Sequence, residues 1–195
     1  MSILANKKIG FVMTASCCTY KKTILQMKKL VELGADVTPI FSNNFQKIDS
    51  RFGNAKEFMN EVEEICGKKA LLTIPEVEPI GPKGYLDLLI IEPCSGNTLA
   101  KIANAIVDTP AVMAAKSMLR NSKPVVIAIS SNDILGLNLK NIGTLINQKN
   151  IYFVPFGQDN FKNKTNSMIA NFELTVETLE YALNNKQIQP IIVEY

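Results

Sequence analysis

The 195-residue sequence contains no histidine and no tryptophan. Without an imidazole, any proton transfer that the protein performs must use water, another side chain or a partner. The four cysteines, Cys17, Cys18, Cys66 and Cys94, include no CxxC pair, which disfavours both a zinc site and a disulfide framework. No stretch approaches the roughly 20 consecutive apolar residues that a membrane helix needs. We therefore expect no resident metal and no membrane partner.

The charge of the chain is nearly balanced. It has 21 basic and 18 acidic residues mixed along its length, for a net charge of +3. No basic stripe interleaved with aromatic residues is present, so nucleic-acid binding is not predicted, whereas small anionic ligands are compatible with the composition. The short apolar run 9–13 is typical of a buried strand rather than an export signal, and free thiols suit a reducing cytoplasm.

Short apolar runs alternate with helical patterns along the chain. The expected strands are 8–13, 36–41, 70–73, 86–92, 124–129 and 151–154, with a possible edge strand or partner-docking segment at 191–193. The expected helices are 20–33, 55–66, 98–106, 111–120, 139–148 and 167–184, and the proline-rich stretch 74–84 is expected to be a loop. This alternation predicts one α/β domain over residues 1–195, a three-layer α/β/α sandwich with a mainly parallel, Rossmann/flavodoxin-like sheet.

In such a sheet, ligands bind outside the carboxyl ends of the strands. The segments that follow the expected strands are rich in hydroxyls and amides: 14–19, 42–44, 93–98, 130–133 and 155–159. The chain has neither a GxxxxGK[ST] loop nor a GxGxxG loop after its first strand, which disfavours nucleoside triphosphates and NAD-type dinucleotides and leaves a mononucleotide phosphate. Thr14, Ser16 and Thr19 have two open interpretations: they cradle a phosphate, or they cap the first helix.

The segment 93–98, Pro-Cys-Ser-Gly-Asn-Thr, is the most informative. Gly96 permits close backbone approach, Asn97 offers a donor and an acceptor, and Ser95 and Thr98 can cap the next helix. The alternative is a plain strand-to-helix cap without a ligand. Cys94 is either a reactive thiol or, as is usual for a buried cysteine, a packing residue.

The run 93–108 resembles the Pro-Ala-Ser-Ala-Asn-Thr signature of the flavoprotein family that contains flavin mononucleotide (FMN)-dependent cysteine decarboxylases and flavin prenyltransferases, including the downstream Ala-Lys and Asp. This resemblance implies a flavoprotein fold and bound FMN. The residues that it implicates in cofactor binding are Thr14, Ala15, Ser16, Ser42, Pro93, Ser95, Asn97, Thr98, Ser130 and Asn132, and the segment 93–98 itself adds Cys94 and Gly96. Lys101 and Asp108 are expected to be surface or interface groups rather than acid-base catalysts.

Two departures separate the chain from those enzymes. The decarboxylases use a histidine that this chain lacks, and the prenyltransferases have a charged site where this chain has Ser130-Ser131-Asn132. The catalytic residues therefore stay unknown.

The segments 90–101, 108–116, 128–133 and 149–159 are more similar to the family of dipicolinate synthase B subunits. That resemblance implies that the chain forms a homo-oligomer and works with an A subunit that binds NAD(P). It also implies a role in making dipicolinic acid from a lysine-pathway dihydrodipicolinate intermediate, in the mother cell of a sporulating bacterium. Two alternatives stay open: a stabilising subunit without flavin, or a stand-alone enzyme of the decarboxylase or prenyltransferase kind.

Overall fold

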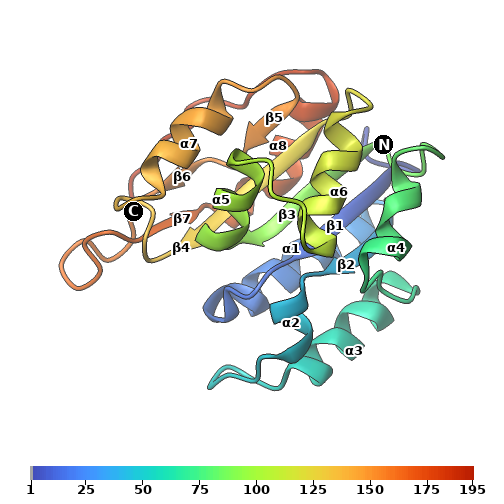
Figure 1. The fold of residues 1–195 in the computed structure, drawn as a ribbon, viewed down its shortest axis with the longest axis horizontal. Coiled ribbons are helices and arrows are strands. Elements are labelled where there is room, and N and C mark those ends of the chain that lie inside the picture. Colours follow the sequence, from blue (N-terminus) through green and yellow to red (C-terminus); the bar gives the residue numbers. More distant parts are fainter. Residues whose placement is uncertain (1) are drawn as a thin grey trace.

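The computed structural model describes residues 2–195 (Figure 1). Its strands are β1 (Lys8–Met13), β2 (Asp36–Phe41), β3 (Leu88–Cys94), β4 (Val125–Ser131), β5 (Ile151–Phe153), β6 (Phe156–Gly157) and β7 (Met168–Ala170). Its α-helices are α1 (Tyr20–Glu32), α2 (Asn43–Lys47), α3 (Ala55–Cys66), α4 (Ile74–Val77), α5 (Gly96–Ala103), α6 (Pro110–Leu119), α7 (Leu139–Ile146) and α8 (Thr175–Leu183). Short 3₁₀ turns lie at η1 (Cys17–Thr19), η2 (Glu78–Ile80) and η3 (Phe172–Leu174).

The sheet is parallel through its centre. Its order is β2-β1-β3-β4, with β5 pairing to β4 in parallel, while β7 joins β4 and β6 joins β7 in antiparallel fashion. The middle strands are mostly apolar and buried on both faces, and all seven residues of β3 are buried. Continuous burial of this kind requires covering layers above and below a parallel sheet.

Helices supply both layers. On one face α1 packs against α3 and α8, and on the other α5 packs against α6 and α7 (Figure 1). The predicted three-layer, mainly parallel α/β/α fold is therefore confirmed. Among residues 2–195, no helix is long and apolar enough to cross a membrane.

Two predictions in the middle of the chain were wrong. Residues 70–73 do not form a strand, because only Leu71 makes a bridge, to Ile40 of β2. The stretch 74–84 is not a plain loop, since it begins with α4 and η2. Thr73 and Glu76 form a reciprocal capping box at the start of α4, and proline is tolerated in a first helical turn, where its missing N–H has no partner to lose.

One prediction near the C-terminus was also wrong, and another was supported in part. The helix expected over 167–184 contains β7 and η3 before α8 begins at Thr175. Asn171 separates them, because its side chain accepts a hydrogen bond from the backbone N–H of Glu173 and so starts a new turn. The segment 191–193, predicted as a possible edge strand, does pair with the sheet edge, through one bridge from Ile192 to Phe156 of β6.

Candidate functional site

The strand order reverses between β1 and β3, because β2 lies on the far side of β1 and β4 on the far side of β3. Ligands of doubly wound sheets bind at such a point, beyond the carboxyl ends of the strands. A cavity of ≈ 170 Å³ lies there. It is lined by residues that follow β1, β2 and β3 and by the start of α6: Ala15, Ser42, Asn43, Asn44, Ser95, Asn97, Thr98, Lys101 and Thr109. Five of these belong to the predicted cofactor site: Ala15, Ser42, Ser95, Asn97 and Thr98.

The hydroxyls after β1 tie loops together. Thr14 Oγ1 donates to the carbonyl oxygen of Pro93 (2.6 Å) and accepts from the backbone N–H of Ser95 (2.9 Å). Ser16 Oγ donates to the carbonyl oxygen of Ser130, and Thr19 Oγ1 donates to that of Ser16 (2.9 Å). Within the described part of the chain, no side chain caps η1 or α1. The helix-capping interpretation of this loop is therefore wrong, and the Thr14 hydroxyl instead joins the loops after β1 and β3.

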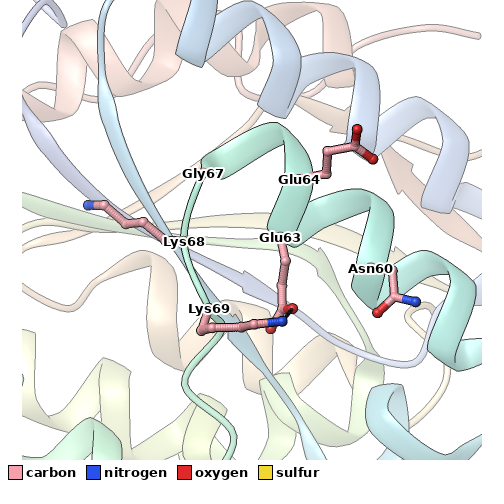
Figure 2. A pocket seen from close by; sticks show the side chains of 6 residues that line it. All are labelled: Asn60, Glu63, Glu64, Gly67, Lys68 and Lys69. Carbon is pink, nitrogen blue, oxygen red and sulfur yellow. Dashed lines mark hydrogen bonds and ion pairs between the residues drawn. The ribbon is translucent and has the colours of Figure 1, made fainter.

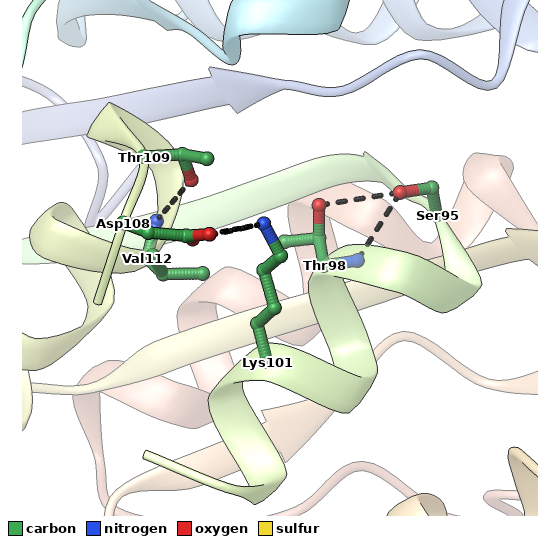
Figure 3. A network of polar contacts seen from close by, with 6 residues as sticks. All are labelled: Ser95, Thr98, Lys101, Asp108, Thr109 and Val112. Carbon is green, nitrogen blue, oxygen red and sulfur yellow. Dashed lines mark hydrogen bonds and ion pairs between the residues drawn. The ribbon is translucent and has the colours of Figure 1, made fainter. Parts of the chain in front are cut away.

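Two serines of the site combine capping with exposure to the cavity. Ser42 Oγ accepts from the backbone N–H of Phe45 (3.3 Å) at the start of α2. Ser95 Oγ accepts from the backbone N–H of Thr98 (3.3 Å) and donates to Thr98 Oγ1 (3.2 Å), as Figure 3 shows. Because Ser42, Ser95 and Thr98 also line the cavity, the capping and binding interpretations of these residues are compatible.

Gly96 is approached closely by the chain itself. A β-carbon at Gly96 would lie 2.8 Å from both Asn138 Nδ2 and Ser131 Oγ. Asn138 is buried and fixed, because it donates to Asp133 Oδ2 (2.7 Å) and accepts from Asn141 Nδ2 (2.8 Å). The glycine lets this amide network seat the start of α5.

The remaining predicted residues do not line the cavity. Pro93 and Cys94 are buried, and burial raises the pKa of the Cys94 thiol far above its ordinary value. A buried, protonated thiol fits the packing interpretation of Cys94. Ser130 is buried beside Thr19, whose hydroxyl lies 3.4 Å from its own, and Asn132 is exposed.

Lys101 contributes the ammonium group of the lining. Its Nζ donates to both carboxylate oxygens of Asp108, at 2.8 and 2.7 Å, and Figure 3 shows the pair beside Thr98 and Thr109. Thr109 Oγ1 also accepts from the backbone N–H of Val112 (3.5 Å) and so caps α6. The lining thus offers hydroxyls, amides and one cation, a donor set suited to an oxyanion.

Lys101, Asn43, Asn44 and Thr109 line the cavity but are absent from the predicted site. A signal for Lys101 was present in the sequence. It follows Asn97 by four positions, so the two residues share one face of α5. Thr109 carries no local signal of this kind, because its place depends on how α6 packs beside α5.

A second hollow lies at the end of α3, lined by Asn60, Glu63, Glu64, Gly67, Lys68 and Lys69 (Figure 2). Its central charges are already paired. Glu63 accepts from the backbone N–H of Ala70 (2.9 Å) and from Lys69 Nζ (2.7 Å), and these contacts lower the pKa of Glu63, the first most strongly. Its Lys68 pairs with Asp36, the first residue of β2, so this hollow lies by the amino end of a strand and is a weaker candidate.

Known proteins resemble the chain both in sequence and in fold. The family model described as Flavoprotein matches residues 2–179. The dipicolinate synthase B subunit of Bacillus subtilis (strain 168) is 46% identical over 194 residues, which cover 100% of this chain and 97% of that protein.

Two solved structures are similar. A crystal structure of the dipicolinate synthase B subunit from Bacillus halodurans C has 47% identity and a TM-score of 0.91, covering 100% of this chain and 99% of that one. The FMN-dependent cysteine decarboxylase SpaF has 17% identity and a TM-score of 0.65 over 93% and 97% of the two chains, a likeness of fold alone.

Proposed function

The chain belongs to the flavoprotein family, and from that premise we propose that it is the FMN-binding B subunit of a dipicolinate synthase. It works with an A subunit that binds NAD(P), forms a homo-oligomer, and acts in the cytoplasm of the mother cell of a sporulating bacterium. The reaction is the two-electron oxidation of a dihydrodipicolinate intermediate to aromatic dipicolinic acid. The substrate loses the equivalent of a hydride and a proton.

The observation that carries this proposal is the cavity at the point where the strand order reverses. Its ≈ 170 Å³ is smaller than the roughly 300–1,000 Å³ of a complete small-molecule site, so it fits the phosphate-bearing end of a flavin rather than the ring. Ser42, Asn43, Ser95, Asn97 and Thr98 would hold that end with hydroxyl and amide donors. When bound, the flavin supplies the electron-accepting chemistry, while the protein binds and orients it.

The cavity has few side chains that could accept the proton that the substrate releases. Lys101 is the one ionisable side chain among the described lining residues. The proton released by the substrate therefore passes to water or to the A subunit. For the same reason a second function is a candidate: a subunit that stabilises or activates the A subunit without flavin.

Purified protein separates these functions. The flavin-binding subunit retains an FMN absorbance band after desalting or regains it on reconstitution, and dipicolinate formation with the A subunit increases on addition of FMN. A colourless protein that cannot be reconstituted, but still activates the A subunit, supports the second function. Turnover by this chain alone would point instead to an independent enzyme.

A matched pair of variants tests the cavity itself. Asn97→Ala removes an exposed amide from the lining, and Asn60→Ala makes the same change on α3. We expect FMN affinity to fall about tenfold or more for the first, as for loss of one good hydrogen bond to a charged group, and to stay unchanged for the second. Equal affinities would place the flavin elsewhere.

A further inference from the structure

We propose that Lys101, held by Asp108, is an oxyanion-binding residue of the cavity and recognises a phosphate or carboxylate end group of a ligand. This inference rests on the proposed function and deepens it, because it assigns a specific charge contact to the ligand. The cavity contains no other cationic side chain among the residues that line it.

The position of Lys101 favours this role. The residue lies on α5 beside Asn97 and Thr98 of the lining, and its side chain is only 21% exposed, whereas that of Asp108 is 53% exposed. Asp108 does not line the cavity. The carboxylate therefore holds the ammonium from the solvent side and leaves the cavity side to a ligand.

The hydrogen bonds of the pair leave one donor available. An ammonium group has three N–H donors. At most two of them go to Asp108 Oδ1 and Oδ2, which lie 2.8 and 2.7 Å from Nζ. The third is available for an acceptor in the cavity, where a charge-assisted bond is stronger than a neutral one.

The size and chemistry of the lining define the class of ligand. A space of ≈ 170 Å³ accepts an end group rather than a whole ring system. The amides of Asn43, Asn44 and Asn97 and the hydroxyl of Thr109 can add donors around that group. Two sources of such an oxyanion exist in the proposed reaction: the phosphate of FMN and a carboxylate of the dipicolinate ring system.

The competing explanation is structural: the pair only fastens α5 to the segment that precedes α6. A partly exposed ion pair contributes little to stability, so Lys101→Met should fold like the original protein. Stability alone cannot separate the two explanations, whereas ligand selectivity can.

The test compares Lys101→Met and Lys101→Arg with the control Lys69→Met, which breaks an ion pair to Glu63 outside the cavity. FMN and riboflavin, which lacks the phosphate, are titrated into each protein, and dipicolinate is titrated into the FMN-loaded protein. We expect Lys101→Met to weaken one ligand at least tenfold, Lys101→Arg to restore most of the loss, and Lys69→Met to have no effect. Asp108→Asn should weaken the same ligand by a smaller factor, with an unchanged unfolding midpoint.

The pattern identifies the source. Weaker FMN with unchanged riboflavin assigns the contact to the flavin phosphate, and weaker dipicolinate with unchanged FMN assigns it to a carboxylate. If Lys101→Met binds FMN and dipicolinate as the original protein does, the inference is overturned.

Failure of the proposed function gives a different result. A protein that binds neither FMN nor dipicolinate overturns that function, and inorganic phosphate then decides the inference. Phosphate that raises the thermal midpoint of the original protein but not of Lys101→Met supports an oxyanion site, and equal responses refute it.

Discussion

Glu92 is a fully buried carboxyl group in β3, the strand that leads to the cavity. One of its oxygens accepts from Thr175 Oγ1 of α8 (2.7 Å), and the other has no partner among residues 2–195. Burial raises the pKa of Glu92 from 4.5 to about 8, against a smaller lowering by Thr175. The desolvation cost of a buried carboxylate explains why the neutral form is favoured.

Stability should therefore depend on pH through Glu92. Below about pH 4.5 the carboxyl group of Glu92 is neutral in both the folded and the unfolded chain. Between pH 4.5 and 8 only the unfolded chain releases this proton, so the free energy of unfolding falls as the pH rises. Glu92→Gln keeps the shape without the charge. We expect the free energy of unfolding of Glu92→Gln, measured in urea, to rise relative to that of the original protein by on the order of 2–4 kcal/mol as the pH is raised from 5 to 8.

An exposed carboxylate provides the control. Glu64→Gln on α3 should leave the pH dependence of the original protein unchanged. A Glu92→Gln protein whose stability falls with pH as steeply as that of the original would show that Glu92 ionises normally.

At the scale of elements, the site is held together by side-chain contacts between loops. Thr14 links the end of β1 to the β3–α5 connection, and Ser16 links the same loop to β4. These contacts place the loops after β1 and β3 beside each other, so that Ala15 and Ser95 line one cavity.

Thr14→Val tests this arrangement, because valine has the shape of threonine but cannot make either hydrogen bond. The change leaves the Pro93 carbonyl and the Ser95 N–H without their partner in a buried place, so we expect a loss of about 1–3 kcal/mol in the free energy of unfolding, together with weaker FMN binding. Thr14→Ser retains the hydroxyl and should lose much less. Similar unfolding free energies for Thr14→Val and the original protein would contradict this account.

The same elements show what the sequence could predict. β1, β2 and α3 have the predicted bounds, because their apolar patterns are bounded by local signals such as Gly34 and the αL cap Gly67. The start of α8 was missed because β7 is a strand only through its antiparallel pairing with β4 and β6, and such a pairing is not encoded locally.

The site was predictable to a similar extent. The hydroxyl-rich and amide-rich segments after the strands could be identified from composition, and seven of their residues line one cavity. The hydrogen bond from Ser16 joins residues 114 positions apart, so no local pattern could distinguish it from a helix cap or a ligand contact.

At the scale of the whole molecule, the chain ends on the antiparallel extension of the sheet. The tail pairs with β6, because Phe156 N–H donates to the Ile191 carbonyl (3.0 Å) and Val193 N–H donates to the Phe156 carbonyl (3.0 Å). Tyr195 Oη donates to the Ile169 carbonyl (3.1 Å) on β7. The tail thereby covers an edge that would otherwise expose unpaired backbone groups.

This closure depends on Gly157. A β-carbon at Gly157 would lie 2.1 Å from the backbone carbonyl oxygen of Val193 and 3.0 Å from the Tyr195 ring, and a backbone atom cannot yield by rotating a side chain. Gly157→Ala should displace the tail while the parallel strands stay folded, because the clash is confined to this edge. We expect faster amide hydrogen exchange at Val193 and easier proteolysis of the tail, with a native core signal.

Gly143→Ala is the matched control, since no described atom beyond its chain neighbours and the backbone of its own helix lies within 4 Å of an added β-carbon there. Gly143 lies inside α7, where alanine favours the helix by about 0.5–1 kcal/mol. This variant should be slightly more stable and exchange normally at Val193. Unchanged exchange at Val193 in both variants would mean that the tail can pack on β6 even with a β-carbon at position 157. The contacts of the tail with β6 would then contribute little to covering this edge of the sheet.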